Sequence, residues 1–257
     1  MTAWATYPYR GRSVLVTGGG TGIGRAIARA FLQQGADVTV VGRSPAPLFA
    51  TVADFPRERT MVMTTDLTDP AGLAAAVDEI QTRFGGLDVV VANTGTGGPG
   101  SRETFDDEAR LRPVDVDAMV RLARLTVPLL RESRGNFLAV SSIAGPRGDW
   151  GRFAYNTTRA AVGGLVRSLA LDLGGDGIRV NAIAPAFTRS RPAEDLLGDP
   201  DRGDLRLDGV ALGRMSEPED IARAALYLAG PDAGCITGVV LPVDGGTGAA
   251  AGTTRPG

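Results

Sequence analysis

Proton transfer in this 257-residue sequence must use Asp, Glu, Tyr, Ser, Cys, water or a cofactor, and two such hydroxyl-bearing side chains lie thirteen residues apart. Ser142 follows a short apolar run, and Tyr155 lies near the start of an Ala- and Gly-rich stretch that is typical of a helix. A hydroxyl can bind a carbonyl oxygen, and a phenol can donate a proton to it. Because a free phenol ionises only near pH ~10, such a tyrosine needs a nearby cation to work near neutral pH.

Arg159 lies four residues after Tyr155 and therefore on the same face of a helix. Arginine keeps a fixed positive charge but cannot release a proton, and its planar fork differs in shape from an ammonium group. The sequence contains no Lys and no His, which excludes Schiff-base lysines, Ser-His dyads and imidazole metal ligands. Cys235 is the single cysteine, so neither a disulfide framework nor a Cys-rich zinc site is expected, and we predict no metal.

A glycine-rich segment joins the apolar run Ser13–Thr17 to an amphipathic helical pattern. Glycines allow the backbone to turn sharply and to approach a pyrophosphate, and a helix N-terminus adds N–H donors and partial positive charge. A tight strand-to-helix turn without a ligand would look similar, but the flanking pattern favours a dinucleotide site. The residues expected to contact the dinucleotide are Gly18, Gly20, Thr21, Gly22, Ile23 and Gly24.

The ends of the following strands indicate which dinucleotide binds. Gly42 stands where a carboxylate would bind the ribose of NAD, and Arg43 follows it, which favours NADP(H) over NAD(H). Alternatively, Arg43 is only a solvated loop charge. Asp66 and Leu67 end the third predicted strand, where the adenine would lie, and Asn93 follows the fourth.

Strands and helices alternate along the chain, which predicts an α/β fold with a doubly wound parallel sheet in a three-layer α/β/α arrangement. We expect one domain over residues 1–257, with a core at about 11–246, a flexible tail at 247–257 and a mobile segment at Arg191–Gly209. The predicted strands are Ser13–Thr17, Val38–Val41, Met61–Met63, Leu87–Val91, Asn136–Val140, Arg179–Ile183 and Val239–Val243. The predicted helices are Gly22–Gln34, Pro70–Phe84 with Asp69 as N-cap, Val114–Glu132, Phe153–Leu173, and one from a capping box at Ser216–Glu219 to Ala229.

Several motifs in the same order resemble those of short-chain dehydrogenases/reductases, in the short single-domain branch of that family. The resemblance spans Gly11–Gly246 and rests on Thr17–Gly24, Asp66-Leu67, Ala92–Gly95, Ile178–Pro185 and Arg214–Gly246. It implies a Rossmann fold and adds Gly95, Tyr155, Arg159, Pro185, Thr188 and Ser190 to the expected cofactor contacts.

The resemblance also assigns roles to the catalytic residues, with two departures. Ser142 would bind the substrate carbonyl and Tyr155 would donate its proton, but Arg159 replaces the family's Lys. Counting back from Pro128, Asp115 replaces the family's Asn. If Asp115 meets Arg159, directly or through a water, the ion pair would cancel the charge on which Tyr155 relies; otherwise Asp115 faces solvent or lies outside the site.

The segment between Ser142 and Tyr155 implies a substrate pocket lined by Trp150 and Phe153, with Phe187 opposite. Aromatic and Arg side chains suit a flat, polar ligand because both stack on π-faces. The alternative is that Trp150 and Phe153 belong to a subunit interface or to the core. We expect Gly95–Gly100 to form the opposite rim and Arg191–Gly209 to close over the pocket.

The expected function is therefore NADPH-dependent reduction of a ketone in a specialised, polyketide-like metabolite. Two alternatives stay open: non-redox chemistry on the same scaffold, such as dehydration, cyclisation or epimerisation, and a cofactor-binding partner without catalysis. By resemblance, the chain would form a homodimer or homotetramer. A net charge of −2 and the absence of a long apolar run predict a cytoplasmic protein without a nucleic-acid or membrane partner.

Overall fold

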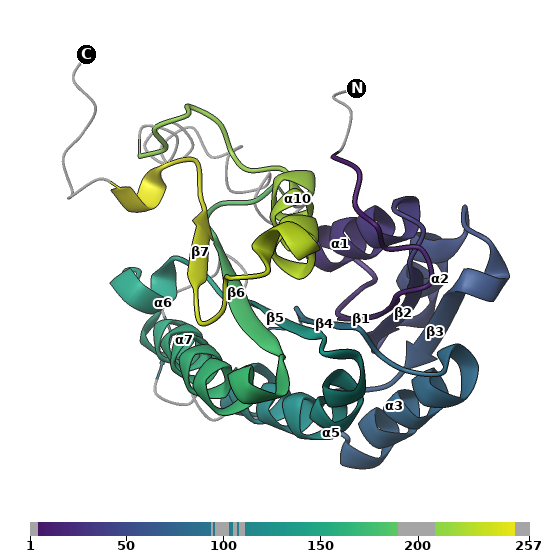
Figure 1. The fold of residues 1–257 in the computed structure, drawn as a ribbon. Helices are drawn as coiled ribbons and strands as arrows, with labels where there is room; N and C mark the ends of the chain where they lie inside the picture. Colours follow the sequence, from purple (N-terminus) through teal and green to yellow (C-terminus); the bar gives the residue numbers. More distant parts are fainter. Residues whose placement is uncertain are drawn as a thin grey trace.

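A seven-stranded parallel sheet forms the centre of the computed structural model, which describes residues 5–93, 95, 103–104, 107, 111–189 and 209–249 (Figure 1). The sheet has the order β3-β2-β1-β4-β5-β6-β7. Its strands are β1 (Ser13–Thr17), β2 (Asp37–Gly42), β3 (Thr60–Thr64), β4 (Val89–Ala92), β5 (Asn136–Val140), β6 (Arg179–Pro185) and β7 (Val240–Val243). The order reverses between β1 and β4, which confirms the predicted doubly wound fold and creates a crevice at their carboxyl ends.

Helices cover both faces of the sheet, because alternate strand residues point to opposite faces and both sets are apolar. The helices are α1 (Gly22–Gln33), α2 (Pro45–Val52), α3 (Pro70–Phe84), α5 (Ala118–Ser133), α6 (Ala144–Arg147), α7 (Phe153–Leu173) and α10 (Pro218–Ala229). One buried cluster unites α1, α2 and α10 with the sheet, and the other unites α3, α5 and α7 with its opposite face (Figure 1).

Helix ends follow the local chemistry of the sequence, with one correction. Asp69 caps α3 as predicted, accepting a hydrogen bond from the Ala71 N–H at 3.1 Å. The capping box of α10 does not start at Ser216: Glu217 is the N-cap and pairs reciprocally with Asp220. Pro218 explains the shift, since it occupies the first helical position and keeps the preceding residue extended.

Two further differences concern element boundaries. The predicted helix Val114–Glu132 is divided, because Pro113–Asp117 forms a π-helical turn before α5 begins at Ala118. Helix α2 was not predicted at all. Of the tail expected to be flexible, Thr247–Ala249 forms a 3-10 turn held by the Asp244 carboxylate, whereas 250–257 lie outside the described residues. Ser190, most of Arg191–Gly209 and positions 96–100 also lie outside them.

The amino-terminal segment packs against α1 and α10. The hydroxyl of Tyr9 donates a 2.6 Å hydrogen bond to the carbonyl of Leu226 in α10, and its ring packs edge-on against Phe31 of α1 with centroids 4.8 Å apart. Burial raises the pKa of the Tyr9 phenol well above its usual value. The first described residues therefore stabilise the contact between α1 and α10.

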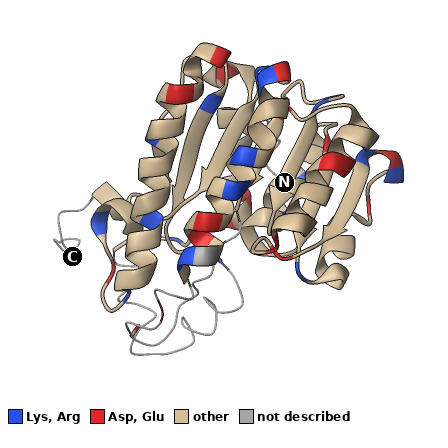
Figure 2. Ribbon diagram, turned by 90° about the horizontal axis from the view of Figure 1, so that it is seen from below, with Lys and Arg blue, Asp and Glu red and all other residues tan. Residues whose placement is uncertain are grey.

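Charges of both signs are interspersed along the outer helices rather than gathered on one face in the view of Figure 2. Among the described helices, none has the length and apolar character needed to cross a membrane.

Candidate active site

The carboxyl ends of the parallel strands meet at one edge of the sheet, and the predicted site residues gather there. The glycine-rich loop follows β1, Asn93 follows β4, and Ser142 follows β5. Helix α7 carries Tyr155 and Arg159 to the same edge. The topology thus unites residues that are far apart in the sequence at the switch point, where ligands bind in this type of fold.

Glycine conformations and hydrogen bonds from Asn93 fix the shape of the glycine-rich loop. Gly18 and Gly22 adopt φ values of 63° and 50°, which other residues avoid. A Cβ on Gly24 would lie 2.8 Å from the carbonyl carbon of Gly18, so only glycine lets α1 begin this close to β1. The Asn93 amide donates to the carbonyls of Thr17 and Gly18 at 3.1 and 3.4 Å. Asn93 therefore holds the loop in place from β4, while Gly20, Thr21 and Ile23 complete the turn and the helix start.

The far end of the crevice carries one exposed cation and one ordered carboxylate. Arg43 directly follows β2 and is exposed. The Asp66 carboxylate accepts hydrogen bonds from the Thr68 N–H at 2.8 Å and its hydroxyl at 2.7 Å. These bonds, with a smaller contribution from Arg43, hold the pKa of Asp66 below its usual value. Leu67 is buried in the core beside it.

Arg159 and Asp115 form a direct, buried ion pair, as the first of the alternatives predicted. Arg159 Nη2 lies 3.2 Å from Asp115 Oδ2, and the two side chains are 6% and 0% exposed. The hydroxyl of Thr158 donates to the same carboxylate oxygen at 3.0 Å, and Arg159 Nη1 donates to the carbonyl of Val140 at 3.2 Å. Asp115 lies within the π-helical turn, a local irregularity that often accompanies functional sites.

The guanidinium of Arg159 also lies against Gly95. A Cβ at residue 95 would be 2.9 Å from Arg159 Cζ, so a larger residue there would displace this guanidinium. Arg159 Nε is buried and has no hydrogen-bond partner among the described residues. Leaving such a donor unpaired is costly, so a bound molecule with acceptor oxygens would stabilise this site.

These features fit a nicotinamide dinucleotide. The glycine-rich loop and the start of α1 offer backbone N–H groups to a pyrophosphate. The unpaired Nε of Arg159 offers a donor to a ribose hydroxyl, and Arg43 lies exposed at the end of β2. Pro185 ends β6, Thr188 forms an isolated bridge with Ser216, and Ser190 lies outside the described residues.

Tyr155 is half-buried between two guanidinium groups. The Cζ atoms of Arg152 and Arg159 lie 4.0 and 5.0 Å from the centroid of its ring. Its helix is capped from a distant loop, since Glu103 Oε2 accepts hydrogen bonds from the N–H groups of Ala154 at 3.0 Å and Tyr155 at 3.2 Å. These contacts fix the backbone at the start of α7 and the position of the Tyr155 ring.

Ser142 is buried at the end of β5. Its hydroxyl oxygen accepts a hydrogen bond from the Ala144 N–H at 3.2 Å, at the start of α6. The neighbouring Ser141 donates its hydroxyl to the carbonyl of Arg159 at 3.2 Å. The β5 end and α7 are thus joined directly behind the candidate catalytic residues.

The three aromatic residues expected in the substrate pocket differ in exposure. Trp150 is 98% exposed on the turn between α6 and α7, and Phe153 is 38% exposed. Phe187 is half-buried after β6, where its carbonyl accepts a hydrogen bond from the Ser216 N–H at 3.1 Å. The exposure of Trp150 is also what the alternative of a subunit contact would require.

Sequence analysis did not single out Glu103 or Thr158. Both act through contacts with segments more than forty residues away, and neither belongs to a motif. A signal existed only for Thr158, which lies three residues after Tyr155 and therefore near its helical face.

Comparisons with known proteins extend over nearly the whole chain. A family profile described as "Enoyl-(Acyl carrier protein) reductase" matches residues 18–248. Meso-2,3-butanediol dehydrogenase of Serratia marcescens is 34% identical over 94% of this chain and 96% of its own length. L-fucose dehydrogenase of Bos taurus is 36% identical over 93% and 90%, respectively.

Solved structures show the same architecture. A 7α-hydroxysteroid dehydrogenase, in complex with NADH and 7-oxo glycochenodeoxycholic acid, aligns with a TM-score of 0.86 and 30% identity over 93% of this chain and 94% of its own. A short-chain dehydrogenase/reductase of unknown function from Caenorhabditis elegans, with cofactor, aligns with a TM-score of 0.84 and 28% identity over 95% and 98%.

Proposed function

The chain belongs to the short-chain dehydrogenase/reductase family, and on that premise we propose that it is an NADPH-dependent ketoreductase. The observation that carries the proposal is the arrangement at the carboxyl edge of the sheet. Tyr155 and a buried Arg159 with an unpaired donor lie on one helix, and Gly95 packs against that donor's side chain. Ser142 ends the adjacent strand.

Each residue has a distinct role in this proposal. The nicotinamide supplies the reducing equivalent when it is bound. The Ser142 hydroxyl binds the carbonyl oxygen of the substrate, and Tyr155 donates a proton to that oxygen. Arg159 orients the cofactor ribose through Nε, while Asp115 balances the charge of Arg159 inside the protein.

The preference for NADPH rests on the end of β2. Gly42 offers no carboxylate to a ribose 2′-hydroxyl, and the exposed Arg43 can pair with a 2′-phosphate. Replacing both residues, as Gly42→Asp with Arg43→Ala, should shift the preference toward NADH. The aromatic side chains Trp150 and Phe153, exposed in the segment that precedes Tyr155, favour a flat substrate, such as a polyketide-like metabolite.

The experiment is to measure NADPH and NADH consumption with a panel of ketones, including aromatic polyketide-like ones. Tyr155→Phe is the catalytic variant, and Arg167→Gln, an exposed residue on the same helix, is the matched control. We expect at least about a hundredfold loss in Tyr155→Phe, in line with the usual effect of removing a general acid, and little change in Arg167→Gln. Unchanged turnover in Tyr155→Phe would remove Tyr155 from the mechanism.

The Asp115–Arg159 ion pair favours one alternative, non-redox chemistry on the same scaffold. Neither member can pass on a proton easily while they are paired, so a proton relay through position 159 is blocked. Substrate conversion without any change in nicotinamide oxidation state would support dehydration, cyclisation or epimerisation. One cofactor consumed per product would exclude it, and any turnover would exclude a purely non-catalytic partner.

We also propose self-association through α5 and α7. Val120 on α5 and Leu171 on α7 are 47% and 85% exposed, and small residues such as Ala160, Ala161 and Gly164 would allow close helix approach. Light scattering after size-exclusion chromatography should therefore give the mass of a homodimer or homotetramer.

A further inference from the structure

Arg152 is the charged group beside Tyr155 that the mechanism above does not use. Its guanidinium carbon lies 4.0 Å from the centroid of the Tyr155 ring, closer than that of Arg159 at 5.0 Å. The side chain is only 19% exposed. Nevertheless, it donates no hydrogen bond to any residue that the structure describes, although a guanidinium carries five donors.

Among the described residues near Tyr155, Arg159 and Glu103 both have close partners. Arg159 is neutralised by Asp115 at 3.2 Å. The Glu103 carboxylate is engaged by two backbone N–H groups at the start of α7, where it offsets the partial positive charge of the helix end. Arg152 forms an ion pair with Asp149 at 3.9 Å, a distance too long for a hydrogen bond, and the Asp149 side chain is half-exposed. Because solvent screens the Asp149 carboxylate, it competes only weakly with a ligand.

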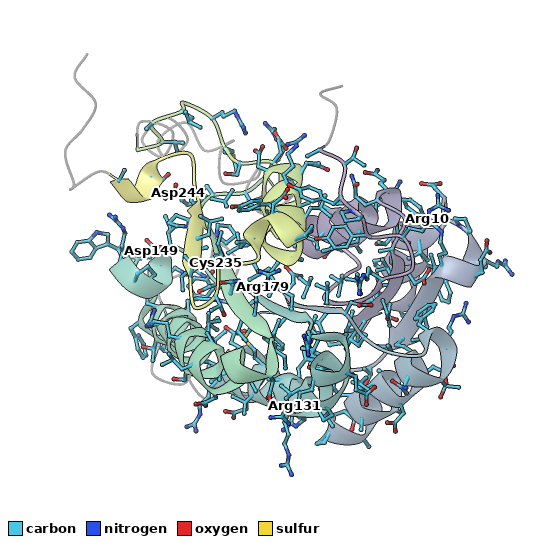
Figure 3. The ribbon with its side chains drawn as sticks, viewed as in Figure 1. Arg10, Arg131, Asp149, Arg179, Cys235 and Asp244 are labelled. Atoms are coloured by element: carbon cyan, nitrogen blue, oxygen red, sulfur yellow. The ribbon has the colours of Figure 1, made fainter. Side chains whose placement is uncertain are left out.

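Asp149 lies on the same side of the molecule as Asp244 (Figure 3). The Arg147 side chain lies close to Gly248, with its Nε 3.5 Å from where a Cβ on that glycine would be. Arg152 lies over the Tyr155 ring and therefore at the candidate site.

From this geometry we propose that Arg152 anchors a carboxylate on the substrate, and that the substrate is therefore a keto acid or the corresponding hydroxy acid. The inference rests on the proposed function, because it assumes that the reacting carbonyl lies at Tyr155. An Arg fork pairs with a carboxylate through two parallel hydrogen bonds. One guanidinium, whose only ion pair among the described residues is the 3.9 Å contact with Asp149, matches one negative charge, which favours a carboxylate over a phosphate dianion.

The test compares acids with their uncharged esters. Benzoylformate and 4-oxo-4-phenylbutanoate, each beside its methyl ester, are titrated into the full-length protein with and without NADP⁺, and binding is measured by calorimetry. The same four compounds are then assayed for NADPH oxidation. In the wild-type protein, at least one acid should bind about tenfold to a hundredfold more tightly than its ester, as expected for a hydrogen bond between charged groups.

Variants assign this preference to Arg152. Arg152→Gln should abolish it, Arg152→Lys should retain part of it, and Arg167→Gln should leave it unchanged. Asp149→Asn should strengthen binding of the acid by up to about fivefold, because it removes the competing carboxylate. Thermal melting checks that each variant is folded.

The outcomes separate the two proposals. Equal binding of acid and ester in both pairs, or an acid preference that survives in Arg152→Gln, would overturn the anchor even if ketones are reduced. Conversely, acid-selective binding that depends on Arg152, without NADPH oxidation, would support the anchor and contradict the ketoreductase function.

Discussion

At the scale of single residues, the buried pair Arg159–Asp115 is the most unusual feature of the site. Arg159 keeps the positive charge of the lysine that it replaces, but Asp115 and Val140 hold its two terminal nitrogens at 3.2 Å each. A charge that is both fixed and compensated helps an adjacent phenol less than a free ammonium would. The sequence left a contact between Arg159 and Asp115 as one of several alternatives, and nothing in it indicated that Thr158 would share the same carboxylate oxygen.

This compensation gives a prediction for the double variant Arg159→Lys with Asp115→Asn. It replaces a fixed pair by an ammonium and a neutral amide, so we expect kcat/KM for simple ketones to rise at least about tenfold. The measurement is NADPH oxidation, with Arg167→Lys as control. If an existing activity instead disappears, Arg159 and Asp115 are required for the reaction as they stand.

At the scale of elements, N-terminal capping marks where α3 and α10 begin. Sequence patterns predicted β1, β5, α3 and α7 at their observed bounds, because apolar periodicity and end signals coincide there. They failed where two signals competed. Pro45 and Pro47 obscured the short helix α2, and the π-helical turn before α5 keeps the same apolar side chains and so leaves no trace in the pattern.

The corrected capping box of α10 gives a pH-dependent prediction. The Asp220 carboxylate accepts hydrogen bonds from Arg214 at 2.7 Å and from the Glu217 N–H at 2.9 Å, and these bonds hold the pKa of Asp220 below its usual 3.8. Because the folded pKa is lowered, the stabilisation is present above pH 3.8 and is lost as the pH falls through the folded value. Asp220→Asn should therefore destabilise the protein by about 1 kcal/mol at neutral pH.

Thermal melts between pH 3 and pH 7 check this. The difference in Tm between the wild-type protein and Asp220→Asn should shrink toward the acid end. Asp78→Asn, on the exposed face of α3, serves as control and should show no such trend. A difference that stays constant with pH would show that the charge of Asp220 is not what stabilises α10.

At the scale of the whole molecule, the alternation of strands and helices predicted the sheet and its doubly wound order, because right-handed crossovers leave few other arrangements. This alternation could not predict which residues hold the amino-terminal segment in place. Tyr9 and Leu226 are 217 residues apart and meet only because α1 and α10 cover the same face of the sheet. The same limit applies to Glu103, whose role depends on how a loop folds back over α7.

The Tyr9 hydrogen bond can be tested directly. Tyr9→Phe keeps the ring against Phe31 but leaves the buried carbonyl of Leu226 without this donor. We expect a loss of about 1–2 kcal/mol and a decrease in Tm of about 2–8 °C. The control is Tyr227→Phe, which removes the hydroxyl of the half-buried residue next to Leu226. This variant should melt close to the wild-type temperature. Equal Tm values for the two variants would exclude a stabilising role for this bond.

The same contact has a consequence for synthesis on the ribosome. Tyr9 is added 217 residues before its acceptor, Leu226. At about 5–20 residues per second, that interval is on the order of 10–40 s. Throughout it, the apolar face of α1 that α10 will cover is exposed to other nascent chains. A chaperone that binds this face until α10 has emerged would prevent such contacts.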